Sequence, residues 1–243
     1  MSTETTPPHD GSFEVYDEIY ERTFGDFYED FTARTLDLVR RYAGRGARIL
    51  DLGAGTGRLA VPLARDGFAV TAVEPCPGML GVLERKAERD GLQIELANVP
   101  MADFRGDGRF DVALCVFTVV SYILDEESLE RSFRAVRQSL RTGGRFLLDV
   151  PASEVFQSTT VRKARIRRSV TISPRGDGVF SFSDEGTLID GGLERHFGPE
   201  SFDIRSWTVD QVAQAVHRAG FQGWDDVTDG LASSGAEYFI TVA

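Results

Sequence analysis

The stretch Ile49-Leu50-Asp51-Leu52-Gly53-Ala54-Gly55-Thr56-Gly57 decides how this chain folds. An apolar run of strand length leads directly into three glycines spaced GxGxG, and a helical pattern follows over Arg58–Arg65. Glycine lets the main chain turn tightly and approach a ligand closely, and the first turn of the next helix offers unpaired N–H donors. The stretch therefore predicts a buried strand, a ligand-binding loop and a helix, in that order.

Further apolar runs have the length of buried strands and are continuous rather than alternating. They are Phe68–Val73, Phe110–Phe117 and Arg145–Val150. Continuous runs are typical of parallel strands that helices cover on both faces. Helical patterns occupy Phe31–Tyr42 and Asp125–Leu140, the second with Asp125 placed to cap it. We therefore predict an α/β fold, a Rossmann-like doubly wound and mostly parallel seven-stranded sheet.

The sequence pattern changes after Pro151. Residues 162–205 show little helical periodicity and are rich in Gly, Ser and β-branched residues. We predict a small antiparallel β insertion with strands Ala164–Ile172, Gly178–Asp184 and Gly186–Ile189, separated by turns at 174–178 and 184–186.

Helical signals return at Thr208–Gln211, which has the spacing of a capping box. The strands Phe221–Val227 and Glu237–Val242, with a turn around 230–235, predict a C-terminal antiparallel hairpin. The expected organisation is a disordered tail over 1–12, a ligand-binding domain over 13–161 and 206–243, and the insertion over 162–205.

Composition narrows the class of protein. The 243 residues suit one domain with a modest insertion, and a net charge of −11 gives no positive field to attract nucleic acid. The first dozen residues lack the apolar run of a signal peptide, and no run approaches the roughly 20 apolar residues of a membrane span. Cys76 and Cys115 are too few for a disulfide framework. We expect a cytoplasmic protein with no metal, since no cluster has ligand spacing.

The second predicted strand ends in Val73-Glu74-Pro75, about 20 residues beyond the glycine loop, where a carboxylate accepts both ribose hydroxyls and repels a 2′-phosphate. An adenosine ligand is therefore favoured over NADP. Arg58 stands where GxGxxG would have its last glycine, which argues against NAD. An NAD-dependent oxidoreductase remains one alternative, and a non-catalytic protein that binds an adenosyl cofactor remains another.

These motifs resemble class I S-adenosylmethionine-dependent methyltransferases over essentially residues 13–243. The resemblance includes the turn Leu140-Arg141-Thr142-Gly143-Gly144-Arg145-Phe146 before the fifth strand. It implies S-adenosyl-L-methionine as the cofactor. The cofactor-binding residues that it implies are Asp51, Gly53, Ala54 and Gly55 at the methionine part, Glu74 at the ribose, Pro75, Met79, Met101 and Ala102 near the adenine, and Cys115, Val116 and Phe117 lining the pocket. Pro100 replaces the usual adenine-binding aspartate, leaving Asn98 or Asp103 for that contact.

Within the class, the chain resembles a small-molecule branch that includes the amino-sugar N,N-dimethyltransferases. The resemblance rests on Val15–Tyr20, Phe117–Tyr122 and an insertion containing Arg195-His196-Phe197. It implies that the N-terminal tyrosines close over the cofactor and that the insertion covers the acceptor. We expect N- or O-methylation of a small molecule by in-line transfer, in a monomer or homodimer. The candidate catalytic residues are Tyr16, Tyr20 and His196, and the candidate acceptor-binding residues are Ser121 and Tyr122. We assign His9 to the tail and give His217 a structural role.

Overall fold

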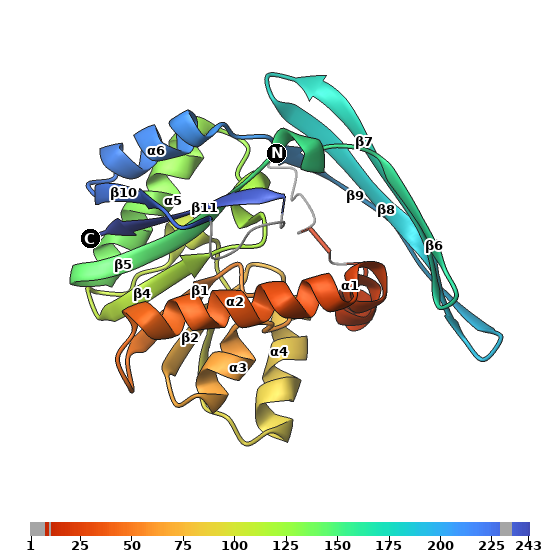
Figure 1. Ribbon diagram of the computed structural model, residues 1–243, viewed down its shortest axis with the longest axis horizontal. Helices are drawn as coiled ribbons and strands as arrows, with labels where there is room; N and C mark the ends of the chain where they lie inside the picture. The colour runs from red at the N-terminus through yellow and green to blue at the C-terminus, as the bar shows by residue number, and fades with distance from the viewer. Residues whose placement is uncertain (1–7, 10, 229–234) are drawn as a thin grey trace, which may run out of the picture.

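The computed structural model describes residues 8–9, 11–228 and 235–243, and within them the strands form one seven-stranded and one four-stranded sheet (Figure 1). The main sheet has the order β10-β11-β5-β4-β1-β2-β3. Its strands are β1 (Arg48–Leu52), β2 (Ala69–Val73), β3 (Ile94–Ala97), β4 (Phe110–Cys115), β5 (Leu140–Pro151), β10 (Gln222–Asp226) and β11 (Ala236–Val242). β1 to β5 are parallel, and β11 is antiparallel to both of its neighbours. The predicted fold class, including its C-terminal hairpin, is confirmed.

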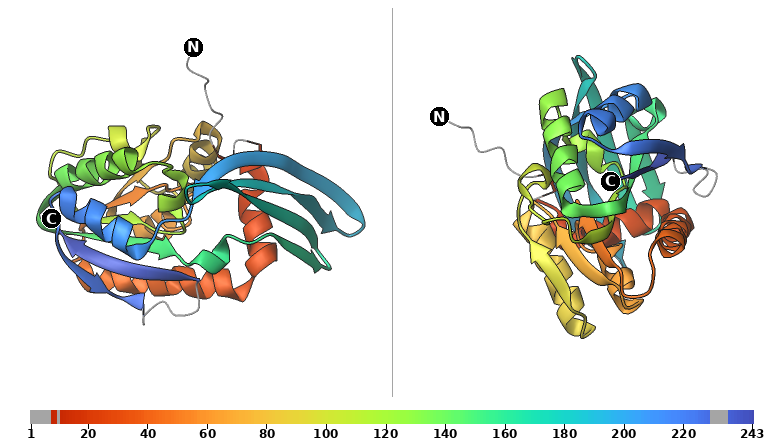
Figure 2. Two further views of the ribbon diagram at one scale, coloured as in Figure 1. Left: turned by 90° about the horizontal axis from the view of Figure 1, so that it is seen from above. Right: turned by 90° about the vertical axis from the view of Figure 1, so that its left-hand side faces the viewer.

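Helices cover both faces of the main sheet, which explains why its strands are continuous apolar runs (Figure 2). The helices α2 (Asp26–Tyr42), α3 (Ala60–Arg65) and α4 (Pro77–Arg89) contribute to the core on one face. The helices α5 (Glu126–Ser139) and α6 (Val209–Arg218) contribute to the core on the other. Asp125 caps α5 by accepting from the Ser128 N–H at 2.7 Å, and Thr208 and Gln211 form the predicted capping box of α6.

The chain crosses from β3 at one edge of the sheet to β4 on the other side of β1. In open α/β sheets, ligands bind beyond the carboxyl ends of the strands at such a reversal of strand order. Two short 3-10 helices lie at this edge, η2 (Met101–Asp103) after β3 and η3 (Val119–Tyr122) after β4. The fold therefore directs attention to the loops after β1, β2 and β4.

The insertion sheet has the order β6-β7-β8-β9 and is antiparallel throughout. Its strands are β6 (Thr159–Lys163), β7 (Ile166–Gly176), β8 (Val179–Asp190) and β9 (Leu193–Arg205), followed directly by α6. The predicted turn at 184–186 is wrong, because β8 continues through it as a bulge between Asp184 and Gly186. A Cβ on Gly186 would lie 2.3 Å from the Arg167 carbonyl oxygen, so glycine serves close strand packing there. The predicted turn around 230–235 lies mostly outside the described residues.

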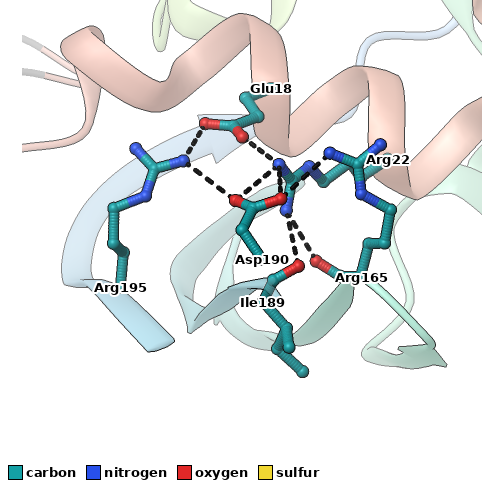
Figure 3. Close-up of polar contacts among 6 residues, drawn as sticks. All are labelled: Glu18, Arg22, Arg165, Ile189, Asp190 and Arg195. Carbon is teal, nitrogen blue, oxygen red and sulfur yellow. Dashed lines mark hydrogen bonds and ion pairs between the residues drawn. The ribbon is translucent and has the colours of Figure 1, made fainter. Parts of the chain in front are cut away.

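Helix α1 (Tyr16–Phe24) bridges the insertion sheet and the main domain. Ile19 packs with Ile166 and Leu188 of the insertion sheet. Beside this contact, Arg22 Nη2 meets the Asp190 carboxylate at 2.9 Å, and Glu18 pairs with both Arg22 and Arg195 (Figure 3).

The same helix contacts the glycine loop of the main domain. Asp17 accepts a hydrogen bond from the Thr56 hydroxyl and pairs with Lys86 of α4, and Lys86 Nζ also donates to the Thr56 carbonyl oxygen at 2.8 Å. Consecutive residues of α1 therefore hold two separate parts of the fold together.

Residues 1–7 and 10 of the predicted tail lie outside the described residues. His9 and Ser12, in contrast, are buried and bond to Glu200 of β9. The polar segment cannot bury these two residues by itself. Their burial depends on packing against partners that are distant in sequence. In the described part of the chain, no helix combines the length and apolar content needed to cross a membrane.

Candidate active site

The glycine loop after β1 keeps its shape through contacts with β2 and η3. The N–H groups of Gly53 and Ala54 both donate to the Val73 carbonyl oxygen, at 2.8 and 3.1 Å. Gly53 has φ +69°, and a Cβ there would lie 2.7 Å from Val119 of η3. Gly55 has φ +54°, yet a Cβ there would have nothing within 4 Å. Gly53 is therefore required by packing within the protein, whereas Gly55 borders open space.

Glu74 joins this loop to the end of β2. Its Oε2 accepts from the Gly55 N–H and its Oε1 from the Cys76 N–H, both at 2.9 Å. Burial raises the pKa of Glu74, and these two N–H donors oppose the rise. The structure thus brings Gly55 and Glu74 together, and the carboxylate retains lone pairs for further donors.

Asp51 lies on β1 just before the loop, with a side chain that is buried to 4% exposure. Burial raises the pKa of Asp51 to about 7, with the backbone N–H of Ala60 opposing the rise and Glu74 adding to it. No donor from the described residues reaches its Oδ2. A buried carboxylate oxygen without a donor is costly, so this atom calls for a cationic or N–H-bearing ligand group.

Arg58 follows the loop and carries a second set of unsatisfied atoms. Its guanidinium carbon lies 3.1 Å from the centroid of the Tyr28 ring and 3.7 Å from that of Phe117. Its Nε and Nη1 are buried without a partner among the residues described, and burial lowers the pKa of Arg58 to about 10. Asp51 therefore suits an ammonium and Arg58 a carboxylate, which are the two charged groups of an amino acid. The sequence analysis considered Arg58 only as the residue that replaces the last glycine of a GxGxxG motif, and it did not predict a binding role for it.

The predicted adenine contacts surround the end of β2. Met79 is buried in α4, Pro75 is exposed, and Met101 and Ala102 lie in η2. Of the two residues left for the adenine amino group, Asn98 donates to the carbonyl oxygens of Glu74 and Pro75, at 2.9 and 3.1 Å, which leaves its own oxygen as an acceptor. Asp103 is exposed. The geometry therefore favours Asn98.

Cys115 and Val116 are buried at the end of β4, and the chain then adopts an unusual backbone. Phe117 and Thr118 both have positive φ, +68° and +64°, which costs a non-glycine residue about 1–2 kcal/mol. The buried Asp149 of β5 compensates by accepting from their N–H groups, at 2.8 and 3.1 Å. Burial raises the pKa of Asp149 to about 7. Asp149 could have been predicted from the sequence, because it is an acidic residue at the end of an apolar run, as Glu74 is.

A row of aromatic rings leads from this backbone toward η3. Ring centroids are 6.0 Å apart for Phe117 and Tyr28, 5.7 Å for Tyr28 and Tyr20, and 4.4 Å for Tyr20 and Tyr16. The row brings together both predicted N-terminal tyrosines. Burial raises the pKa of Tyr16, so this phenol stays protonated near neutral pH.

His9 extends this row from Tyr16, with 4.9 Å between their centroids. Its Nε2 lies 2.8 Å from the Tyr122 hydroxyl of η3, and its Nδ1 lies 3.0 Å from Glu200 Oε1 of β9. The neighbouring Ser121 is buried, with no hydrogen-bond partner for its hydroxyl in the described part of the protein. His9 and Glu200 were missed because no local pattern marks either residue.

The predicted catalytic role of His196 is not supported by its position. In the pairing of β8 with β9, His196 lies opposite Thr187, and Arg195 lies opposite Leu188. Leu188 packs against Ile19 of α1. Side chains alternate along a strand, so His196 points to the other face of the insertion sheet. It is exposed and bonds to the Thr187 hydroxyl at 3.1 Å. Among the described residues, no group of three His, Cys, Asp or Glu side chains could hold a metal.

Comparison with known proteins adds to this geometry. Residues 49–144 match the model of a family described as a methyltransferase domain. The chain is 28% identical to a putative methyltransferase of Geobacillus sp. (strain WCH70), over 94% of this chain and 96% of the relative.

Solved structures share the whole fold. An S-adenosylmethionine-dependent methyltransferase from Clostridium acetobutylicum superposes with a TM-score of 0.80 at 20% identity, covering 95% of this chain and 98% of that one. An amino pentose methyltransferase from Micromonospora echinaspora, with S-adenosylmethionine bound, gives 0.76 at 23% identity, with coverages of 94% and 96%. The methyltransferase-domain match and the relative from Geobacillus, together with the shared fold, identify the chain as an S-adenosylmethionine-dependent methyltransferase.

Proposed function

We propose that this enzyme methylates a nitrogen or oxygen atom of a small molecule that is held between the glycine loop, α1 and the insertion sheet. The observation that carries the proposal is the aromatic row, which runs without a break from Phe117, at the cofactor residues, to His9, at the insertion sheet. The 162–205 insertion would then cover the acceptor. The net charge of −11 disfavours nucleic acid as the acceptor.

Within this proposal, the cofactor meets the unsatisfied groups of Asp51 and Arg58 and two further polar groups, those of Glu74 and Asn98. Asp51 Oδ2 takes the ammonium, Arg58 the carboxylate, Glu74 the ribose hydroxyls and Asn98 the adenine amino group. S-adenosylmethionine, when bound, supplies an electrophilic methyl group on a sulfonium. The protein's part is to exclude water and hold the attacking atom in line, and the aromatic rings are suited to both tasks.

An amino sugar is the first acceptor that we propose. The support is the amino pentose methyltransferase described above, whose fold extends over nearly all of this chain, including the insertion. Hydroxyl-bearing small molecules are the second candidate class. The family membership excludes an NAD-dependent oxidoreductase. We also propose a cytoplasmic setting, which its two buried cysteines suit.

Native mass spectrometry of the purified protein tests the cofactor, and we expect S-adenosylmethionine or its demethylated product to be retained. A panel of amino sugars, phenols and small amines with methyl-labelled cofactor then tests transfer. Labelled product from an amino sugar would support the first acceptor class. Tight cofactor binding without transfer to any member would favour the non-catalytic alternative.

We expect cofactor binding to strengthen as the pH rises from about 5 through about 7, because the raised pKa of Asp51 leaves its carboxyl protonated and uncharged at the acid end. Only the ionised carboxylate attracts an ammonium, so binding should release a proton in this range. Calorimetry in buffers of different ionisation enthalpy measures both effects. Asp51→Asn should bind more weakly and with a flat pH profile, whereas a wild-type affinity independent of pH would contradict this role.

A further inference from the structure

Three side chains from distant parts of the sequence form a continuous hydrogen-bonded chain. Tyr122 of η3 contacts His9 Nε2 at 2.8 Å, and His9 Nδ1 contacts Glu200 Oε1 of β9 at 3.0 Å. His9 is 7% exposed. The rings of Tyr122 and Phe202 lie 5.9 and 4.9 Å from that of His9, centroid to centroid, and hold it edge-on.

The chemistry of Glu200 sets the direction of these bonds. Burial raises its pKa, but the hydrogen bonds that it makes with His9 and Ser12 leave the pKa below its usual range. Glu200 is therefore a carboxylate, which can only accept, so His9 Nδ1 must carry a proton. In a neutral imidazole, Nε2 is then the acceptor, and the Tyr122 hydroxyl donates to it.

The outer end of this chain lies beside the cofactor residues. Tyr122 is on η3, whose Val119 blocks any side chain at Gly53. Burial raises the pKa of Tyr122, and the nearby Glu74 adds to that rise. Among the described residues, the other titratable or charged groups facing the cluster from the packed elements are Tyr16 and Tyr20 of α1 and Arg168 of β7.

We propose that Tyr122, His9 and Glu200 form a proton relay, which takes a proton from a hydroxyl or a protonated amine of the acceptor, at the atom that becomes methylated. The proton bonds to Tyr122 Oη as the tyrosine's own proton moves to His9 Nε2. The electron pair of the broken bond stays on the acceptor atom, where it can accept the methyl group. His9 becomes an imidazolium, and the Glu200 carboxylate balances its charge.

This relay rests on the proposed function, and it assigns different tasks to its members. Tyr122 touches the acceptor and is the catalytic residue. His9 and Glu200 act through Tyr122 and are positioning residues that also store the proton. Tyr122 alone could not take up a proton, because burial raises its pKa well above the usual value and so keeps its hydroxyl protonated. The histidine and carboxylate behind it remove that difficulty.

Ser12 supplies a matched control for a merely structural role. Its hydroxyl donates to the same Glu200 Oε1, at 2.8 Å, and anchors the same N-terminal segment to β9. It lies outside the path of the proton. Ser12→Ala therefore loosens the anchor and leaves the relay intact.

Nitrogen-15 NMR of the imidazole rings tests the relay without cofactor or acceptor. The chain has three histidines, so comparison with His9→Gln assigns the His9 signals. We expect the neutral ring of His9 to be the Nδ1–H tautomer, with Nε2 unprotonated. Glu200→Gln should shift it toward a mixture of tautomers. An Nε2–H tautomer in the wild type would overturn the relay while leaving methyl transfer as the proposed function.

Kinetics with the acceptor that the panel identifies supply the second test. Tyr122→Phe and His9→Ala should each lower kcat about 100-fold without changing the cofactor Kd, which is the scale of general base catalysis. Glu200→Gln should lower kcat about 10-fold, and imidazole in solution should restore part of the His9→Ala activity. The losses should be larger with hydroxyl than with amine acceptors, because a neutral hydroxyl is the weaker nucleophile.

The pH profile separates chemistry from anchoring. Because the relay needs a neutral imidazole, kcat/KM of the wild type should rise with pH, and this rise should vanish in His9→Ala. Ser12→Ala should keep the rise, and its loss of kcat should stay well below that of His9→Ala. Wild-type kcat in His9→Ala, or an equal loss of kcat in Ser12→Ala without imidazole rescue, would overturn the relay. If no member of the panel is methylated, the proposed function fails and the NMR result still decides whether His9 has an accepting Nε2.

Discussion

Gly55→Val is expected to abolish measurable binding of S-adenosylmethionine while the protein stays folded. A Cβ at this position meets no atom of the protein within 4 Å, so the valine side chain would occupy the open space that we assign to the cofactor. The N–H of the same residue holds the Glu74 carboxylate in place at 2.9 Å. Titration calorimetry gives the affinity, and circular dichroism confirms the fold.

Gly67→Val is the matched control for this variant. Gly67, in the turn between α3 and β2, also has a positive φ, +87°, and nothing within 4 Å of a Cβ. Both substitutions impose a backbone strain of roughly 1–2 kcal/mol, so both should lower the melting temperature by similar amounts. Only Gly55→Val should lose the cofactor. Equal affinities in the two variants would place the cofactor elsewhere.

Arg168→Met is expected to lower the free energy of unfolding by about 3–5 kcal/mol, as for other buried ion pairs that lose one partner. Arg168 and Asp184 are 5% and 3% exposed, and their Nη2 and Oδ2 atoms lie 2.7 Å apart. The substitution would leave the Asp184 carboxylate buried without its counter-charge. Urea denaturation followed by fluorescence measures the change.

The neighbouring residue supplies the control. Arg167 pairs with Glu194 at 2.6 Å, but both side chains are about half exposed, at 50% and 42%. Arg167→Met should therefore cost less than about 1 kcal/mol. The double variant Arg168→Met, Asp184→Leu should recover most of the loss, because it removes both buried charges. Similar losses for Arg167→Met and Arg168→Met would contradict this account.

Some predicted site residues can be found from the local sequence pattern alone. Gly55 and Glu74 each follow a buried strand, and the carboxyl ends of neighbouring parallel strands meet at one edge of a sheet. Asp149 could have been identified by the same reasoning.

The remaining site residues depend on packing between distant segments. His9 and Glu200 are 191 residues apart, and the burial of Arg58 depends on Tyr28, 30 residues before it. No periodicity or spacing contains such contacts. His196 illustrates a finer limit, because adjacent residues of a strand face opposite ways and the bulge at Asp184 to Gly186 fixes the register of β8 against β9.

Helix α1 has a kinetic consequence for the two ligands. Asp17 ties it to Thr56 of the glycine loop, and Glu18, the next residue, ties it to Arg195 of the insertion sheet. Under the proposed function, this one short helix is a wall common to donor and acceptor. Any movement that lets the spent donor escape must also disturb the enclosure around the methylated product, so the two departures are mechanically linked.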